Sequence, residues 1–230
     1  MDLDDNLKGN LDNFAYNVKK HNWDWLHINS GMERSGKSGF SLFMARFLSE
    51  ECGLKFDWSP ALKNVFFFEK NLAAKMMKIP DKSVVLLDEG GEMLMSRRAM
   101  EKEVVNIIQT LMIYGSKNIF LIINIPDWRW LDKYVRESRI RSLCVVRTRP
   151  RFVLDEGKRR VIRERGYYSF YARQPVVTAS REDSELGKAG FRGRFGNFAR
   201  AYPREWECYS AKKTAFLENK IFETPKKSKN

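Results

Sequence analysis

Residues 31–38 read Gly31-Met32-Glu33-Arg34-Ser35-Gly36-Lys37-Ser38, the pattern Gly-x-x-x-x-Gly-Lys-Ser of a phosphate-binding P-loop. The stretch follows the apolar run 23–28 and opens an amphipathic segment over 37–51, which gives the order strand, loop, helix that this motif needs. Glycines allow a tight turn whose N–H groups converge on phosphate oxygens, and the helix adds its positive N-terminal dipole. The sequence therefore predicts a nucleotide site at this turn.

The residues expected to contact the nucleotide share this turn and the start of its helix: Gly31, Met32, Glu33, Arg34, Ser35, Gly36, Lys37, Ser38 and Gly39. Lys37 can reach the β- and γ-phosphates, and Ser38 can ligate Mg²⁺. We therefore expect ATP and Mg²⁺ as cofactors. The alternative is a chance glycine turn, and a second half of the site about 50 residues downstream argues against it.

That second half is the segment 83–89, an apolar run that ends in Asp88 and Glu89 and matches a Walker B pattern. A continuously apolar strand is buried on both faces, as in a parallel sheet, and ligands bind at the carboxyl ends of such strands. We expect Asp88 to hold Mg²⁺ through a water molecule opposite Ser38, and Glu89 to polarise the attacking water as general base. Alone the run is a weak signal, but with the P-loop it indicates nucleotide hydrolysis.

Other apolar segments complete an α/β core. Strands are expected at 23–28, 64–69, 83–89, 118–124 and 141–146, and helices at 7–20, 37–51, 71–78, 93–114 and 128–138. Asn124 ends the fourth strand and is either a sensor of the γ-phosphate or an ordinary strand-end cap. His27 lies inside the first strand and is interpreted as structural, because two histidines support neither a metal cluster nor a catalytic triad.

The chain becomes strongly basic near residue 147. Residues 1–150 hold 23 Lys and Arg against 19 Asp and Glu, whereas residues 151–230 hold 19 against 10. Segments 147–154 and 158–171 alternate arginine with apolar and aromatic residues, which indicates antiparallel strands. We interpret 175–197 as a loop, 203–220 as a helix and 225–230 as a disordered tail. A P-loop core over 1–150 and a basic appendage over 151–230 are therefore predicted.

A basic surface of this size suits a polyanion, most simply nucleic acid, although a solvated strand face has the same pattern. The cysteines Cys52, Cys144 and Cys208 are scattered, which argues against a zinc site or a disulfide framework and fits a reducing compartment. The polar N-terminus is unlike a signal peptide, and no apolar run is long enough to span a membrane. We expect a protein that is not itself transmembrane.

The inserted strand at 64–69, together with Glu89 beside Asp88, resembles the additional-strand, catalytic-glutamate branch of P-loop ATPases. Within that branch, segment 118–146 is similar to the FtsK–HerA superfamily of DNA pumps. Members have an apolar strand with a polar sensor, then a proline, an aspartate-containing helix and an arginine-bearing link into a last strand. The matching residues are Asn124-Ile125-Pro126-Asp127, Leu131-Asp132 and Arg139-Ile140-Arg141. The usual sensor is glutamine, so Asn124 departs from the pattern.

The small size and the early P-loop also resemble viral genome-packaging ATPases and zonula-occludens-toxin-like ATPases of phages, archaeal viruses or plasmids. The resemblance covers about residues 20–150. It implies a mainly parallel five-stranded sheet of order 5-1-4-3-2 and a homo-oligomeric ring of six or five subunits with ATP between neighbours. It also implies an arginine from the adjacent subunit, worth about 10³-fold in rate. The candidates are Arg97, Arg98, Arg136, Arg139 and Arg141, with Arg34 as an alternative acting in cis. For Arg97 and Arg98, a solvated surface position is the favoured alternative.

The leading hypothesis is an ATP-hydrolysing motor that translocates double-stranded DNA, most simply to package a viral genome. Lys37, Glu89, Asn124, Arg139 and Arg141 would form its catalytic set. One alternative is an ATPase for virion assembly or extrusion, with capsid or membrane protein as its partner. A nucleotide-dependent switch and a small-molecule kinase are the others. The implied location is the cytoplasm of an infected or plasmid-bearing host cell, with association with the virion as the alternative.

Overall fold

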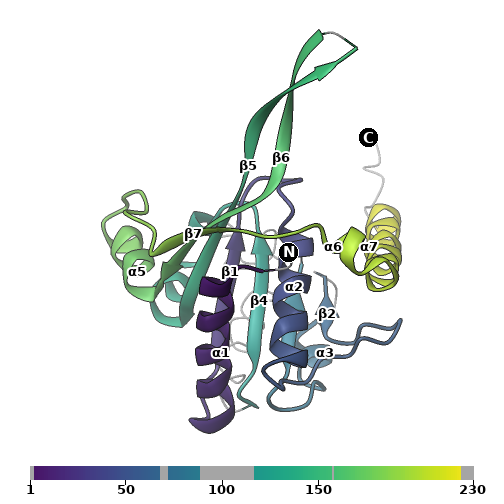
Figure 1. The fold of residues 1–230 in the computed structure, drawn as a ribbon. Coiled ribbons are helices and arrows are strands. Elements are labelled where there is room, and N and C mark those ends of the chain that lie inside the picture. The colour runs from purple at the N-terminus through teal and green to yellow at the C-terminus, as the bar shows by residue number, and fades with distance from the viewer. Residues whose placement is uncertain (1–2, 68–71, 89–116, 157, 224–230) are drawn as a thin grey trace, which may run out of the picture.

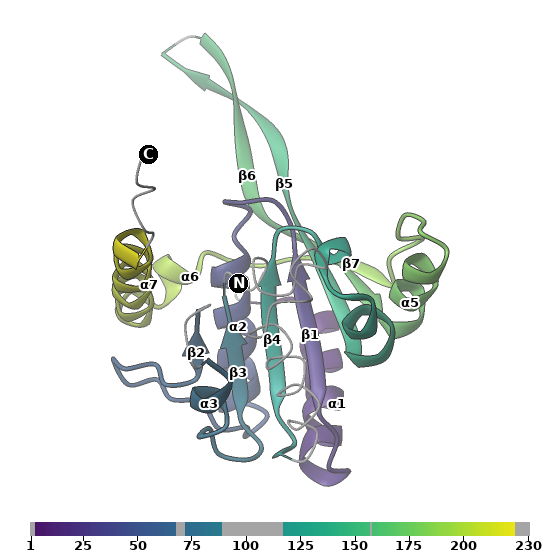
Figure 2. The same cartoon turned by 180° about the vertical axis from the view of Figure 1, so that it is seen from behind.

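The computed structural model describes residues 3–67, 72–88, 117–156 and 158–223. Within these residues, seven strands form one mixed sheet of order β2-β3-β4-β1-β5-β6-β7. The strands are β1 (Trp25–Ser30), β2 (Val65–Phe66), β3 (Val84–Leu87), β4 (Phe120–Ile125), β5 (Ile140–Asp155), β6 (Lys158–Ala172) and β7 (Phe191–Arg194). Figure 2, seen from behind, shows β3, β4 and β1 side by side in its centre.

The first five strands pair in parallel, in the order that the family resemblance implied. Every residue of β1, β3 and β4 is buried, because helices and loops cover both faces of a parallel sheet. Parallel strands bring their carboxyl ends to one edge. The P-loop after β1, Asp88 after β3 and Asn124 near the end of β4 therefore lie at the same edge of the sheet.

The sheet does not stop at β5, so the prediction of a mainly parallel five-stranded sheet was wrong in its extent. β6 pairs antiparallel with β5, and β7 pairs antiparallel with β6. The cause is the aromatic run in the second half of β6, because Tyr168, Phe170 and Tyr171 are buried in the core beside β5. β5 runs through residue 150, and the division of the chain at that residue stays a prediction.

Two helices, α1 (Asp5–Lys20) and α2 (Lys37–Glu50), pack on one face of the sheet (Figure 1). The Asp4 side chain accepts a hydrogen bond from the Leu7 amide and caps the start of α1. The shorter helices are α3 (Leu72–Met76), α5 (Arg173–Arg181) and α6 (Phe198–Ala201), and the chain closes with α7 (Pro203–Glu223). In the described parts of the chain, every helix is too short or too polar to cross a lipid bilayer.

Two local predictions were wrong. The helix expected at 128–138 is a 3-10 turn, η4 (Trp128–Trp130), and a π-helical turn, η5 (Val135–Arg139), separated by an extended Leu131. The loop expected at 175–197 contains β7 and most of α5, because Pro175 lies in the first helical turn, where proline is tolerated, and Gly193 gives β7 room beside Tyr168. The predicted helix 93–114 and tail 225–230 lie outside the described residues.

A long hairpin extends from the edge of the sheet that carries the P-loop. β5 pairs with β1 up to Val145, opposite Ser30, and then continues as far as Asp155. The chain returns as β6, which stays paired with β5 from Lys158 to Ala172. Figure 1 shows this ribbon rising well beyond the body of the molecule. We call residues 147–165 the hairpin arm.

Candidate nucleotide-binding site

The P-loop backbone has a shape that only glycine permits at its two ends. A Cβ atom on Gly31 would lie 2.3 Å from the carbonyl oxygen of Val146 in β5, so a side chain is sterically excluded there. Gly36 has a φ of 101°, in the left-handed region, and is the N-cap residue of α2. No side chain caps this helix. Its first-turn amides therefore suit an anion such as a phosphate.

Lys37 lies across the loop that it follows. Its Nζ donates to the carbonyl oxygen of Gly31 at 2.5 Å and to that of Met32 at 2.9 Å. The ammonium group is therefore held beside the turn whose amides face the expected phosphates, and it neutralises the carbonyl dipoles there. A bound phosphate chain would offer the same group stronger acceptors, since hydrogen bonds between charged partners are about twice as strong as neutral ones.

The structure brings Ser38 and Asp88 together although 50 residues separate them in the chain. The Ser38 hydroxyl donates to Oδ2 of Asp88 at 2.8 Å, and the carboxylate is almost fully buried. A hydroxyl and a carboxylate are hard oxygen ligands of the kind that Mg²⁺ prefers. This donor pair, beside a helix N-terminus without a side-chain cap, fits a magnesium–nucleotide complex.

A cavity of about 430 Å³ opens over this pair, a size within the range of small-molecule sites. Its wall includes Lys37, Ser38, Asp88 and Asn124, in agreement with the grouping expected from the motifs. Its other wall was not expected from the sequence. It is formed by Arg165 of β6 together with Trp206 and Lys213 of α7.

Helix α7 contacts Asp88 directly. The Tyr209 hydroxyl donates to Oδ2 of Asp88, and Lys213 Nζ lies 3.5 Å from the same oxygen. Burial alone would raise the pKa of Asp88, but the charge of Lys213 and the hydrogen bonds from Tyr209, Asn124 and Ser38 hold it below its usual value. The carboxylate is therefore ionised at neutral pH.

A chain of buried hydrogen bonds leads to the other oxygen of Asp88. Its members are Trp25, Ser142, His27, Asn29, Ser41, Asn124 and Asp88, which come from β5, β1, α2, β4 and the end of β3. Asn29 Oδ1 can only accept, so His27 must donate through Nε2 and accept from Ser142 at Nδ1. Each subsequent group then donates toward Asp88, where Asn124 Nδ2 meets Oδ1 at 2.9 Å.

These buried hydrogen bonds show how the side chains of His27 and Asn124 are held in the site. His27 is fully buried, and burial lowers its pKa to about 4 against the opposing effect of its hydrogen bond with Asn29, so the ring is neutral. It supports the site from within the sheet, in line with the structural interpretation. Asn124 contacts the Walker B aspartate through its amide, and its role as a γ-phosphate sensor stays a prediction.

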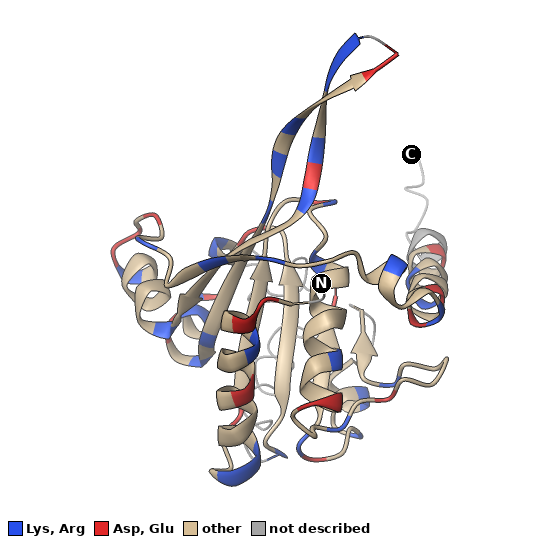
Figure 3. Ribbon diagram, viewed as in Figure 1, with Lys and Arg blue, Asp and Glu red and all other residues tan. Residues whose placement is uncertain are grey.

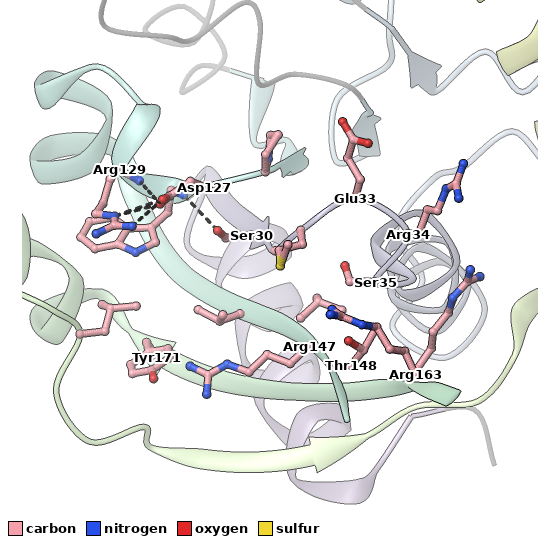
Figure 4. Close-up of a pocket in the computed structure, with 18 of the residues that line it drawn as sticks. Ser30, Glu33, Arg34, Ser35, Asp127, Arg129, Arg147, Thr148, Arg163 and Tyr171 are labelled. Carbon is pink, nitrogen blue, oxygen red and sulfur yellow. Dashed lines mark hydrogen bonds and ion pairs between the residues drawn. The ribbon is translucent and has the colours of Figure 1, made fainter. Parts of the chain in front are cut away.

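A second cavity of about 780 Å³ lies on the outer side of the P-loop (Figure 4). Figure 4 shows Glu33, Arg34 and Ser35 on its loop side, and Arg147 and Arg163 on its strand side. Its lining residues Glu33, Arg34, Pro126 and Arg165 also line the smaller cavity. The base of the hairpin arm and the phosphate site therefore share a wall that is rich in arginine.

The remaining predicted residues lie elsewhere or outside the described residues. Arg139 pairs with Asp24, and the Arg141 guanidinium lies 5.5 Å from the centre of the Trp23 ring. Both arginines lie near the start of β5, which pairs with the start of β1, whereas the P-loop follows the end of β1 at the other edge of the parallel sheet. Their action on a neighbouring subunit's nucleotide stays a prediction, as does that of Arg136. Glu89, Arg97 and Arg98 lie outside the described residues.

The arrangement of strand, P-loop, helix and Walker B strand in a sheet of this order is a P-loop NTPase fold. No protein-family model matches the chain, and no curated protein matches it in sequence.

Three solved structures illustrate what the fold is similar to. One is the crystal structure of the FIGL-1 AAA domain, with 14% identity and a TM-score of 0.43 over 62% of this chain and 52% of that chain. A second is a chain of the E. coli MS115-1 HORMA:CdnC:Trip13 complex, with 13% identity and a TM-score of 0.40 over 59% and 60%. The third is the N-terminal domain of zonular occludens toxin from Neisseria meningitidis, with 17% identity and a TM-score of 0.43 over 79% and 98%. This chain therefore spans only about half to three fifths of the first two.

Proposed function

We propose that the protein is an ATP-hydrolysing motor that acts on double-stranded DNA through its hairpin arm. The observation that carries the nucleotide half of this proposal is the contact between Ser38 and Asp88 at 2.8 Å, beside the uncapped N-terminus of α2. Nucleotide sites of this fold need a hydroxyl and a carboxylate as a pair at that position. Packaging of a viral genome and assembly into a ring of subunits are further parts of this proposal.

The chain's own residues would divide the work as follows. The amides of the P-loop and Lys37 would bind and orient the phosphates, while Ser38 and Asp88 would hold Mg²⁺. The bound ion would neutralise charge that develops on the phosphates. Asn124 keeps the Asp88 carboxylate oriented through its hydrogen bond to Oδ1. Glu89, next to Asp88 in the sequence, would position the attacking water.

The DNA half of the proposal rests on the hairpin arm. Residues 147–165 contain eight Lys and Arg against three Asp and Glu, and these basic side chains are exposed. Figure 3 shows blue segments along both strands of the projecting ribbon. A two-stranded ribbon fits the major groove of DNA, and its basic side chains would neutralise backbone phosphates. The arm is therefore the part of the described structure best suited to a duplex.

The position of the arm supports coupling between DNA and nucleotide. Arg163 and Arg165 of β6 line the cavity beside the P-loop, and Arg165 also lines the phosphate cavity. A load on the arm would act on β6, which contributes to both cavities, and on β5, which lines the larger one. Val146 of β5 contacts the backbone at Gly31 closely enough to exclude any side chain there. A shift of β5 would therefore be transmitted to the P-loop.

The test is ATP hydrolysis with and without duplex DNA at low salt. We expect DNA to stimulate turnover, Lys37→Ala to abolish it, and a triple variant of Arg149, Arg151 and Arg160 to alanine to lose the stimulation while keeping basal turnover. The log–log slope of DNA affinity against salt should fall by about three in that variant, one unit for each lost phosphate contact. Equal hydrolysis with and without DNA would count against the motor.

One observation favours the second candidate, an ATPase that acts on capsid or membrane during virion assembly. The arm exposes four large apolar side chains, Phe152, Leu154, Val161 and Ile162, and Phe152 lies opposite Val161 across the hairpin. Apolar side chains contribute little to binding the phosphate backbone but suit a protein or lipid surface. Replacement of Phe152 and Leu154 by serine separates the two candidates. Loss of capsid or vesicle binding with intact DNA binding supports the second candidate.

A further inference from the structure

We propose that helix α7 gates the magnesium side of the site, with Tyr209 and Lys213 holding the Asp88 carboxylate until a magnesium–nucleotide complex displaces them. The inference rests on the proposed nucleotide site. It adds two residues, 121 and 125 positions from Asp88 in the chain, that neither motif contains.

The contacts converge on one oxygen. Oδ2 of Asp88 accepts from the Ser38 hydroxyl and from the Tyr209 hydroxyl, and it also lies 3.5 Å from the Lys213 ammonium group. Oδ1 of the same carboxylate is directed the other way, toward Asn124. The oxygen that faces Ser38, and that would serve a shared cation, is therefore the one that α7 engages.

Electrostatics makes the two occupants exclusive. The Asp88 side chain is only 4% exposed, so solvent screens its charge weakly and the carboxylate attracts a nearby positive charge strongly. Lys213 supplies one positive charge where the proposed cofactor would supply two. A second cation added beside the ammonium group would be repelled by it, and the Tyr209 hydroxyl would compete for the same lone pairs.

The rest of α7 has its own attachments, so the gate can open locally. Glu205 Oε1 accepts from Arg46 of α2 at 3.1 Å, and Lys212 donates to the carbonyl oxygens of Leu62 and Val65 at 2.8 and 2.7 Å. Neither contact involves Asp88. The Lys213 side chain is 26% exposed and can swing toward solvent. The Tyr209 side chain is 1% exposed, so its release requires the turn of α7 around it to loosen while the contact at Glu205 holds.

The test measures binding of a fluorescent ADP analogue with and without Mg²⁺ in wild type, Lys213→Ala, Tyr209→Phe and Arg204→Ala. Arg204 is an exposed residue of α7, so its variant matches the charge change of Lys213→Ala away from Asp88. We expect Lys213→Ala and Tyr209→Phe each to raise the affinity in Mg²⁺ about tenfold, the scale of one hydrogen bond to a charged group. Without Mg²⁺ the affinity of the two gate variants should not rise above that of wild type, and the affinity of Arg204→Ala should stay within about twofold of wild type under both conditions.

Hydrogen exchange gives an independent readout. Addition of the analogue with Mg²⁺ to wild type should speed amide exchange over residues 209–216, while the analogue alone should not. Unchanged or lower affinity in both gate variants, or unchanged exchange in wild type, would overturn the gate. A wild-type protein that binds no analogue under either condition overturns the nucleotide site itself, so the two failures are distinguishable.

Discussion

The amide nitrogen Nδ2 of Asn124 donates to Oδ1 of Asp88 at 2.9 Å, while its carbonyl oxygen accepts from the Ser41 hydroxyl. Both ends of the amide are therefore used, and its orientation is fixed. The side chain of Asn124 is buried between β3 and α2, where an unmatched polar group would be costly. Asn124 thus fixes the orientation of the Asp88 carboxylate, whether or not it also contacts a nucleotide.

Asn124→Asp should destabilise the protein in a pH-dependent way. The change turns a donor into a second buried carboxylate within hydrogen-bond distance of Asp88, so we expect a loss of about 3 kcal/mol at pH 7. Near pH 5 two adjacent carboxyl groups can share a proton, and much of the loss should be recovered. Urea unfolding at both pH values measures this. Asn118→Asp, at the exposed contact with Asn22 before β4, is the control and should change stability by less than about 0.5 kcal/mol.

The motifs were sufficient to predict which residues would meet at the core of the site. Gly36, Lys37 and Ser38 are adjacent in sequence, and a buried strand that ends in Asp88 can bring its carboxylate to them only at the carboxyl edge of a parallel sheet. Local sequence carried this information because each half of the site belongs to one strand and its following turn. The order of the first five strands was implied by the family resemblance and not by the motifs alone.

The contacts of Tyr209 and Lys213 with Asp88 could not be predicted from local motifs. α7 reaches Asp88 because β7 joins the sheet beyond β6 and the chain then crosses to α6 and α7, on the other side of α2 (Figure 1). That route depends on a strand containing Gly193, which the glycine-rich composition had marked as a loop. The buried chain through Asn29 and Ser41 was missed for a similar reason, because it depends on the register of β1 against β4 and on the rotation of α2.

Stability should rise with pH between about 4 and 6.5 because of His27. Its pKa is about 4 in the folded protein and 6.5 in an unfolded chain, so the unfolded state binds the extra proton in this window. Acidification through the window therefore favours unfolding, by about 3 kcal/mol at its lower end. His27→Gln should flatten the pH dependence of the unfolding free energy. His21→Gln changes the other histidine, on an exposed turn, and should leave the slope intact; equal slopes in all three proteins would contradict the assignment.

Gly31→Ala and Gly9→Ala should have effects of opposite sign. At Gly31 a new methyl group would meet the Val146 carbonyl oxygen at 2.3 Å, a backbone atom that cannot move without shifting β5, so we expect a loss of about 2 kcal/mol or more and weaker nucleotide binding. At Gly9, on the exposed side of α1, nothing lies within 4 Å of the added atom, and alanine is the better helix former by about 1 kcal/mol. Thermal unfolding of both variants gives the comparison. A loss at Gly9 similar to that at Gly31 would show that steric exclusion is not the cause.

Arg46 should hold the start of α7 against α2. Its guanidinium lies 4.0 Å from the centre of the Tyr202 ring and pairs with Glu205 at 3.1 Å, both at or near the first turn of α7. Arg46→Ala should therefore lower the free energy of unfolding by about 1–2 kcal/mol and speed amide exchange over residues 203–208, because a stacked cation and a partly buried ion pair are lost together.

The control is the other ion pair of Arg46. Arg46 also pairs with Glu50 one turn along α2, at 2.8 Å, but that carboxylate is 45% exposed. Glu50→Ala should thus change stability by less than about 0.5 kcal/mol and leave exchange in α7 unaltered. If Glu50→Ala loosened α7 as much as Arg46→Ala, the anchoring would lie within α2 and not between the two helices.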